Sequence, residues 1–372
     1  MSSGVISVPL ELICDGQGQP FQYLNRGDFT LHRPLQSLIS GVGVEAYRLN
    51  LAYCGRVSNA VIFGKSYVMA ESKHVAFVHQ SHRDYVPQEF AHYYKAQIIN
   101  DTRPRPYVSE ECCFLGGYSG DAKYFGHFIF EFLYRLAAFE MSGLLERFPV
   151  AVFDDVPDSW LSFIELYGVP KSRLKKISRL PAPFFRNVWT ASCPNALSSA
   201  GYAFWDEGIF RMRERLLANA ISAGDAGPKR IFIGRRDATH RKLLNEAEVW
   251  AFLEANGFEY VEFAGKPAAE QIRLMRSAEI AVVVSGSNGS LTPFAPRDCI
   301  IIDFLPIHIQ GGLGAKGFAA VLGQIYERIP ARIVDDGSKV GLSNDFDVDI
   351  EAVRRAVSLA IEFKGGSAVV EK

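Results

Sequence analysis

The second half of the chain alternates short apolar runs with amphipathic segments, and this alternation restricts the possible folds more than any other feature. The run Ile280–Val284 is apolar throughout, as expected for a parallel strand that is buried on both faces of a sheet. The other strands and helices of this series are expected at Arg230–Ile233, from Glu246 to Gly257, and at Tyr260–Phe263, Ala268–Ser277 and Ile300–Phe304. This order predicts an α/β fold with a doubly wound, mostly parallel sheet and right-handed crossovers.

The chain has 372 residues, which is long for one hydrophobic core, so two domains are expected. Glycine and proline in the stretch Gly224–Pro228 mark the boundary. We therefore expect an N-terminal domain over residues 1–225 and a C-terminal domain over 229–345, followed by a last helix within 346–372. Within the N-terminal domain, short runs between polar turns predict a β-meander from Val57 to Val78.

Composition excludes several classes of protein. The net charge of -1 gives no electrostatic footprint for nucleic acid. No apolar run approaches the ~20 residues that span a bilayer. The six cysteines are dispersed and form no C-x-x-C pair, a usage that suits a reducing cytoplasm and predicts no disulfide framework.

A cationic segment follows the strand Arg230–Ile233. It turns at Gly234 and carries Arg235, Arg236 and Arg241 before a helix that Asn245 is expected to cap with its side chain. Guanidinium groups bind phosphate oxygens in a bidentate manner, and ligands of open α/β sheets lie beyond the carboxyl ends of strands. A phosphorylated ligand is the functional interpretation, and a solvated charged loop is the alternative.

A second loop follows the buried strand Ile280–Val284. In its sequence, Ser285 to Leu291, the glycines Gly286 and Gly289 would let the backbone approach an anion, and the following amides would open a helix. The alternative is a tight turn without a ligand. Asp303 lies inside the next apolar run, and a buried carboxylate needs a partner. It would accept a hydroxyl of a ribose or donor sugar, or else cap a neighbouring helix.

The segment from Phe125 to Leu144 predicts a helix that is apolar nearly all round and therefore buried. Its ionisable residues His127, Glu131 and Arg135 are spaced four apart and fall on one face. Such a stripe either faces a cleft or satisfies itself as an internal ladder that holds the helix in place.

Three other motifs are interpreted as structural. Gly312–Gly317 matches the G-x-G-x-x-G string of dinucleotide sites but lies near the end of its domain, and we interpret it as a loop before a helix. Asp345 and Asp347 precede the last helix, where carboxylates serve as caps. Asp154 and Asp155 would make an incomplete shell for a cation. No metal site is expected.

Taken together, these separated pieces resemble glycosyltransferase family 61. The pieces that carry the resemblance, in chain order, are Tyr124–Glu131 with Arg135, Ile231–Arg236, Arg241, Asn245-Glu246, Glu270-Gln271, Ile280–Ser285, Asn288–Leu291 and Asp303. The resemblance spans residues 55–330. It implies a GT-B-like architecture, in which two Rossmann-like domains face each other across a cleft and the last helix crosses back to the first domain. It also implies an inverting transfer without a bound metal or other cofactor.

The resemblance assigns the donor, a nucleotide sugar, to the C-terminal domain. The residues expected to bind it are Arg235, Arg236, Arg241, Glu270, Ser287, Asn288, Gly289, Ser290 and Asp303. His127 or Glu131 is expected to be the base that deprotonates the acceptor. Histidine starts with a pKa of ~6.5, close to what a base needs near neutral pH, and we rank it first with Glu131 orienting it.

The acceptor implied is a saccharide, free or lipid-linked, in capsule or exopolysaccharide synthesis. The expected location is the cytoplasm or the inner face of the membrane, with peripheral association there. The chain departs from the family pattern at Asn288, where a histidine usually stands, and at Pro293, where an asparagine is usual. Because asparagine is neither a base nor a cation, an inactive sugar- or nucleotide-binding homologue is the first alternative. A dinucleotide oxidoreductase based on Gly312–Gly317 is the second.

Overall fold

The computed structural model describes residues 22–23, 29–49, 53–63, 67–70, 75–76, 103–116, 125–191, 196–198, 201–220, 227–236, 238–306, 314–334 and 344–367. The chain forms two compact units. Unit 1 comprises Met1–Phe29, Arg48–Leu197 and Phe204–Arg215, and unit 2 comprises Thr30–Tyr47, Ser198–Ala203 and Leu216–Lys372. None of the described helices has the length and apolar character that crossing a membrane requires.

Unit 1 contains a mixed sheet with the strand order β10-β9-β8-β11-β4-β5-β6. Its parallel part is formed by β8 (Cys112–Phe114), β9 (Val150–Phe153), β10 (Leu174–Ile177) and β11 (Phe184–Ala191). Its antiparallel part, β4 (Tyr53–Phe63), β5 (Tyr67–Ala70) and β6 (Val75–Ala76), is the predicted β-meander. The short strands β1 (Gln22–Tyr23) and β7 (Tyr107–Val108) pair with β4 and β11. The meander strands pair antiparallel because their connections are short, so parallel pairing is limited to the other half of the sheet.

The buried helix of unit 1 is continuous but not uniform. It starts as α2 (Phe125–His127), widens into a π-helical turn, η3 (Phe128–Leu133), and continues as α3 (Tyr134–Met141). The other helices of this unit are α4 (Asp158–Tyr167), η4 (Lys171–Arg173) and most of α5 (Asp206–Ala220). The Oη atom of Tyr134 accepts from the Trp205 N–H at 2.6 Å and fixes α3 to the start of α5. An added Cβ at Gly208 would lie 2.4 Å from the Tyr134 ring, so glycine permits this packing.

Unit 2 contains the predicted parallel sheet. Its strand order is β15-β14-β16-β17-β18-β2-β3, and β19 pairs antiparallel with β18. The strands are β14 (Arg230–Ile233), β15 (Glu259–Val261), β16 (Ile280–Val284), β17 (Ile300–Pro306), β18 (Ile325–Val334) and β19 (Asp345–Val348). The strands β12 (Ala196–Ser198) and β13 (Gly201–Ala203) pair with each other and form a separate two-stranded sheet.

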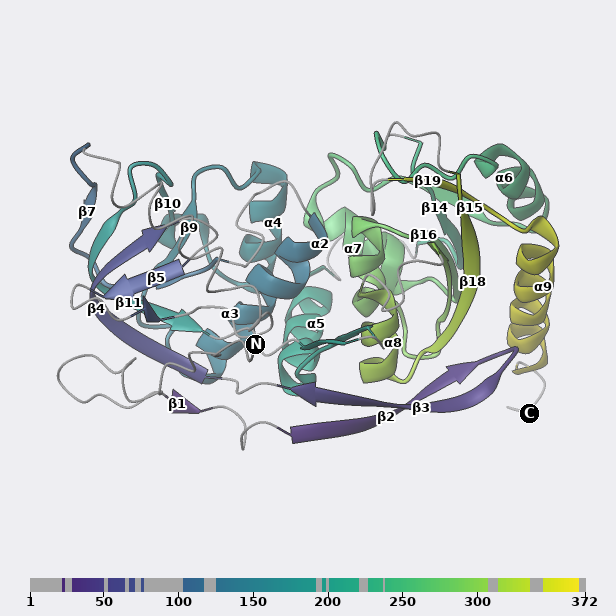
Figure 1. Ribbon diagram of the computed structural model, residues 1–372, viewed down its shortest axis with the longest axis horizontal. Coiled ribbons are helices and arrows are strands. Elements are labelled where there is room, and N and C mark those ends of the chain that lie inside the picture. The colour runs from purple at the N-terminus through teal and green to yellow at the C-terminus, as the bar shows by residue number, and fades with distance from the viewer. Residues whose placement is uncertain are drawn as a thin grey trace, which may run out of the picture. The chain divides into compact units, whose positions relative to one another are not determined.

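Helices cover both faces of the unit 2 sheet. On one face, α6 (Glu246–Ala255) and α9 (Ile350–Ser367) pack Leu253 and Val357 against strand residues such as Phe232 and Val282. The other face carries α7 (Ala268–Arg276), the 3-10 helix η6 (Ser287–Phe294) and α8 (Ala315–Leu322), as Figure 1 shows for α7 and α8. The doubly wound α/β arrangement expected from the sequence is confirmed for this unit.

Two segments differ from the expected domain limits. Although they lie within residues 1–225, β2 (Phe29–Ser37) and β3 (Gly41–Leu49) extend the sheet of unit 2. The pairing Ile325↔Gln36 and a 2.6 Å hydrogen bond from Ser37 Oγ to Glu327 Oε2 fix β2 to β18, whose edge backbone groups would otherwise lack partners. The last helix, α9, packs within unit 2, because its apolar stripe is part of that core.

The connection of the strands changes direction at β14. From β14 the chain goes to β15 on one side, and from there it passes to β16 on the other side. In an open α/β sheet, the carboxyl ends of two strands that flank such a switch point bound the usual ligand crevice. The loops that follow β14 and β16 are the two that the sequence predicted as phosphate-binding.

Candidate active site

The turn after β14 brings its two arginines to different neighbours. Arg235 lies against Gly286, at the start of the loop that follows β16: a Cβ added at Gly286 would lie 1.7 Å from Arg235 Nη1. The guanidinium group also donates from Nη2 to the His240 carbonyl at 3.2 Å. The space that glycine leaves at position 286 is therefore occupied by an arginine, where the sequence had suggested only a close approach of the backbone to a ligand.

Arg236 lies on the ring of Tyr260 in the adjacent strand β15. Its guanidinium carbon is 4.0 Å from the ring centroid, and its Nε is 3.5 Å from Glu246 Oε1. The Tyr260 hydroxyl donates to the same Glu246 oxygen at 2.5 Å. The side chain of Arg236 is 51% exposed, so it is held from one side and open to solvent on the other.

The remaining part of the arginine loop is also ordered by specific contacts. Arg241 is half-buried and has a φ of 56°, in the left-handed region that residues other than glycine rarely adopt. The Lys242 N–H donates to Asp345 Oδ1 at 2.8 Å, which ties the loop to the start of β19. Backbone conformations of this kind are concentrated at binding sites. The solvated-loop alternative does not account for these contacts.

The loop after β16 forms the helix η6, as the sequence suggested. Ser287 and Asn288 are half-buried, whereas Gly289 and Ser290 are buried. A Cβ at Gly289 would lie 3.6 Å from Val283 Cγ1 and 3.7 Å from Ala315 Cβ, at the start of α8. Gly314 of the G-x-G-x-x-G string is the N-cap residue of α8 with a φ of 93°. Residues 307–313, including Gly312, lie outside the described residues.

Asp303 is buried in β17, and its hydrogen bond goes to a side chain on the neighbouring strand rather than to the end of a helix. Its Oδ2 accepts from the Tyr326 hydroxyl at 2.9 Å, on the neighbouring strand β18, and its Oδ1 has no hydrogen-bond partner among the described residues. Arg328 stands opposite Asp303 in the register of β17 and β18. Burial raises the pKa of Asp303 to about 6, while the Tyr326 hydrogen bond and the Arg328 charge act in the opposite direction.

The predicted contact between His127 and Glu131 is present in unit 1. Nδ1 of His127 lies 2.5 Å from Oε1 of Glu131, and their side chains are 26% and 2% exposed. Arg135 follows on α3 and is only 1% exposed. The side chain of His127 is thus the most exposed of this stripe, and the side chains of Glu131 and Arg135 are buried. A contact with a buried carboxylate fixes the tautomer of the imidazole, with Nδ1 protonated.

Three other acidic residues considered from the sequence, Glu270, Asp155 and Asp347, pair with cations of the protein. Glu270 accepts from Lys266 Nζ at 2.6 Å, one turn away on α7. Asp155 pairs with Arg179 at 2.8 Å, and Asp347 pairs with Arg332 on β18. Asp347 therefore bridges two strands of a sheet and does not cap the following helix.

Asn245 occupies the N-cap position of α6, but its side chain makes no capping hydrogen bond. It binds the backbone of Val348 instead: Nδ2 donates to the carbonyl at 2.8 Å, and Oδ1 accepts from the N–H at 3.2 Å. The capping prediction was wrong, because a partner 103 residues away in sequence satisfies the amide in both directions.

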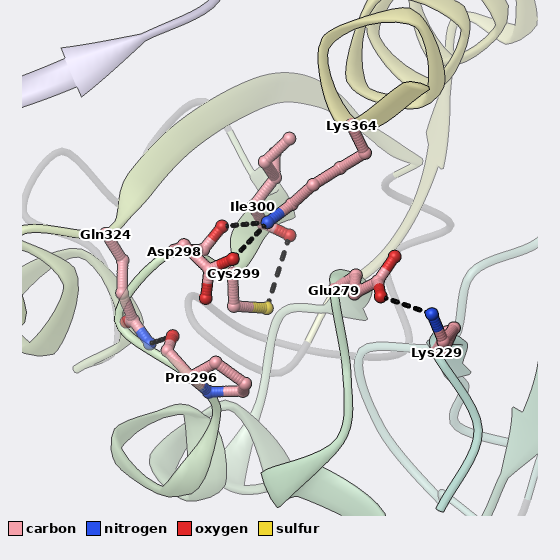
Figure 2. A network of polar contacts seen from close by, with 8 residues as sticks. All are labelled: Lys229, Glu279, Pro296, Asp298, Cys299, Ile300, Gln324 and Lys364. Carbon is pink, nitrogen blue, oxygen red and sulfur yellow. Dashed lines mark hydrogen bonds and ion pairs between the residues drawn. The ribbon is translucent and has the colours of Figure 1, made fainter. Parts of the chain in front are cut away.

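A cavity of about 420 Å³ lies at the opposite, amino ends of the same strands. It is lined by Pro228, Lys229, Arg230, Gly257, Glu259, Glu279, Lys364 and Gly365. Figure 2 shows Lys364 of α9 reaching Asp298 and Lys229 paired with Glu279, at 2.8 Å in each case. Cations and acids alternate here and neutralise one another, so this cavity lacks the unbalanced positive charge that a diphosphate requires.

The sequence interpretation assigned no function to two residues that contact Arg235 and Arg236, namely Tyr260 and Glu246. Tyr260 became visible only through the pairing of β14 with β15, which places it beside the turn, whereas Glu246 was already among the pieces that carry the family resemblance. The sequence signal for this contact is the glycine at position 234. The structure explains it, because a Cβ added there would lie 2.0 Å from Tyr260 Oη.

Comparison with known proteins points to one family. The model of the family described as Glycosyltransferase 61 matches residues 125–302, a range that contains His127, Glu131, the arginine loop and η6. No curated protein matches the chain. Among solved structures, the chain is similar to the bacterial iron-containing dodecameric glycosyltransferase TibC from enterotoxigenic E. coli H10407, with 10% identity, a TM-score of 0.29, and coverage of 79% of this chain and 80% of that one. The match over residues 125–302 supports the assignment of the chain to glycosyltransferase family 61.

Proposed function

We propose that this glycosyltransferase inverts the anomeric carbon as it moves a sugar from a nucleotide-sugar donor to a hydroxyl group of a saccharide or lipid-linked saccharide. The proposal rests on the close contact between the Arg235 guanidinium group and Gly286. This contact joins the loops after β14 and β16 at the switch point of unit 2. Two loops at such a point, with three arginines on one of them, suit a diphosphate.

In this proposal unit 2 binds the donor. Arg235, Arg236 and Arg241 neutralise the diphosphate, and the backbone amides of Asn288 and Gly289 at the start of η6 donate to its oxygens. Ser287 and Ser290 contribute hydroxyl groups beside them. Asp303 and Glu270 are the acids proposed to contact the sugar or ribose. Oδ1 of Asp303, which has no partner in the part of the chain that the structure describes, is available for such a contact, whereas Glu270 would first have to release Lys266.

His127 of unit 1 is the proposed base. With Nδ1 engaged by Glu131, Nε2 takes the proton of the acceptor hydroxyl, and the buried carboxylate stabilises the imidazolium that forms. The acceptor oxygen attacks the anomeric carbon from the face opposite the leaving group. The bond from that carbon to the diphosphate oxygen breaks, and its electron pair leaves with the diphosphate, where the arginines balance the added charge. The arginines supply the positive charge, so the proposed reaction uses no metal.

The biological setting proposed is the synthesis of a capsule-type or other surface polysaccharide. Donor nucleotide sugars are charged and water-soluble, so we place the reaction in the cytoplasm or at the inner face of the membrane, with the lipid-linked acceptor reached by peripheral association.

A second candidate is a sugar- or nucleotide-binding homologue without transferase activity. It is favoured by Asn288 and Pro293, which replace residues usual in the family and which both lie in η6. The dinucleotide oxidoreductase is a weaker candidate, because the family match is to a glycosyltransferase and the glycine string is separated from the end of β17 by residues 307–311.

A panel of nucleotide sugars and NAD, screened by thermal shift and then calorimetry, tests these candidates. A nucleotide sugar that binds and is hydrolysed or transferred, with inversion seen by NMR of the anomeric proton, supports the enzyme. Binding without turnover for every acceptor and for water supports the inactive homologue. Binding of NAD alone would reject both.

A further inference from the structure

We propose that Tyr260, which no sequence motif marks, is a positioning residue for the arginines that bind the diphosphate. This inference rests on the proposed function. Tyr260 lies on β15, the strand next to β14, and faces Phe232 in the register of the two strands. It therefore lies beside the turn that carries Arg235 and Arg236, and it acts on that turn through three separate contacts.

The first contact is made by the ring. Arg236 stacks on it with a distance of 4.0 Å from guanidinium carbon to ring centroid. The ring itself is held edge-on by Phe232 and Trp250, each with a centroid distance of 5.3 Å. A cation on an aromatic face gains energy only while the face keeps its orientation. These two neighbours keep the face toward Arg236.

The second contact is made by the hydroxyl group. It donates to Glu246 Oε1 at 2.5 Å, and the other carboxylate oxygen of Glu246 accepts from the Arg235 N–H at 3.3 Å. Glu246 is only 8% exposed, so its carboxylate depends on such partners. Through Glu246, Tyr260 thus orients the backbone of Arg235. The same carboxylate pairs with the side chain of Arg236.

The third contact is steric. The Tyr260 hydroxyl occupies the space where a side chain at position 234 would stand, 2.0 Å from the added Cβ. The Arg236 N–H also approaches Tyr260 Oη at 3.4 Å. One side chain therefore meets all three successive residues of the turn, Gly234, Arg235 and Arg236, directly or through Glu246. Preorganised donors of this kind bind an anion without first paying the entropy of ordering.

Two substitutions at one position separate the contacts, and calorimetry with inorganic diphosphate measures them. Tyr260→Phe removes the hydroxyl and keeps the ring, so the dissociation constant should rise about tenfold, as expected for a lost hydrogen bond to a charged group. Tyr260→Leu removes both and should weaken binding further. Arg236→Lys keeps the charge but loses the planar stacking group, and it too should weaken binding about tenfold.

Unit 1 offers a matched control. There the Tyr167 hydroxyl donates to Glu140 Oε2 at 2.6 Å, and Arg215 pairs with the same carboxylate. Tyr167→Phe removes the same kind of bond in unit 1, whereas the proposed diphosphate site belongs to unit 2. It should lower the melting temperature as Tyr260→Phe does, and it should leave diphosphate binding unchanged.

The outcomes are distinguishable. If the wild-type protein does not bind diphosphate, the donor site of the proposed function fails and this inference fails with it. If the wild type binds but folded Tyr260→Phe binds equally well, Tyr260 is a structural residue only and the inference alone is overturned. Should Tyr260→Phe prove unfolded, Arg236→Lys decides, because Arg236 is half exposed and outside the core; unchanged affinity in that variant rejects the role of the ring.

Discussion

Nδ1 of His127 lies 2.5 Å from Oε1 of Glu131, one turn further along the helix, in the turn η3, whose other residues are apolar. The carboxylate is buried and the imidazole is partly exposed, so the pair is oriented with its histidine outward. An internal ladder would not need its outermost member to remain accessible. This geometry favours a base with a supporting acid over the purely structural alternative.

His127→Ala is expected to lower the turnover number by ~10²–10⁴-fold, the usual contribution of a general base. Glu131→Gln should lower it as well, because the amide no longer stabilises an imidazolium. Donor affinity, measured by calorimetry, should not change in either variant. Glu165→Gln, which alters an exposed carboxylate on α4, is the control. Wild-type turnover in both His127→Ala and Glu131→Gln would remove this helix from the mechanism.

Arg235→Ala should weaken binding of the nucleotide diphosphate by ~1.5–3 kcal/mol, the range for a hydrogen bond to a charged group. The loss should appear in the dissociation constant and grow smaller as salt is added. Lys229→Ala is a suitable control, since Lys229 lies at the amino end of the same strand and is paired with Glu279. Equal affinities for the wild type and Arg235→Ala would refute the phosphate assignment.

Gly286→Ala tests the same arginine without changing its charge. The new methyl group would stand 1.7 Å from the present position of Nη1, so the guanidinium group must move. Because the end of a flexible side chain yields easily, we expect weaker donor binding with little loss of thermal stability. Gly365→Ala, in α9 and with open space around the added Cβ, should leave donor binding unchanged and should not lower thermal stability, because alanine is the better helix former. A Gly286→Ala variant that is greatly destabilised would mean that the glycine serves the backbone.

The raised pKa of Asp303 predicts that the free energy of unfolding falls as pH rises. Its pKa in the folded protein, about 6, lies above the value of 3.8 expected without burial. The folded state therefore holds the proton more tightly than the unfolded state, and the stabilisation is complete below 3.8 and lost as pH passes through about 6. Asp303→Asn can still accept from Tyr326 and does not titrate. The free energy of unfolding, compared at pH 5 and pH 7, should fall less in the variant than in the wild type; parallel changes would show that Asp303 is ionised throughout.

Asn245→Ala should lower the free energy of unfolding by ~1–3 kcal/mol, because it leaves the N–H and carbonyl of Val348 without their partners. Asn245→Ser separates this role from capping. Serine caps a helix as well as asparagine does, but its short side chain cannot bind both backbone groups. Chemical denaturation of Asn245→Ser should therefore resemble that of Asn245→Ala. Recovery of wild-type stability would restore the capping interpretation.

Much of unit 2 could be predicted because its signals are local. A run such as Ile280–Val284 is buried on both faces whatever its neighbours are, and the loops at the ends of such strands are located as soon as the strands are. The same reasoning predicted the positions of the arginine loop and η6, and it predicted that His127 and Glu131 would meet, since a helix brings residues four apart together.

The remaining features depend on partners that are distant in sequence. The side chain of Asn245 turns toward Val348, and Asp303 finds Tyr326 only through the register of β17 and β18. Similarly, β2 completes an edge formed by β18, nearly 300 residues later. A local pattern shows that a polar group needs a partner, but several candidates satisfy it equally well. Long-range pairing then selects one of them.

The widened turn η3, Phe128–Leu133, has a consequence for how this helix tolerates change in length. A π-helical turn accommodates one residue more than the α-helix around it would hold, and each residue of an α-helix corresponds to a rotation of ~100°. Deleting one residue between positions 128 and 133 would let an unbroken α-helix form. It would also swing His127 away from its present direction relative to Tyr134, which is anchored to Trp205. The extra residue thus determines the direction in which the His127 side chain points. An enzyme without this residue could keep its fold and stability and still lose its catalytic activity.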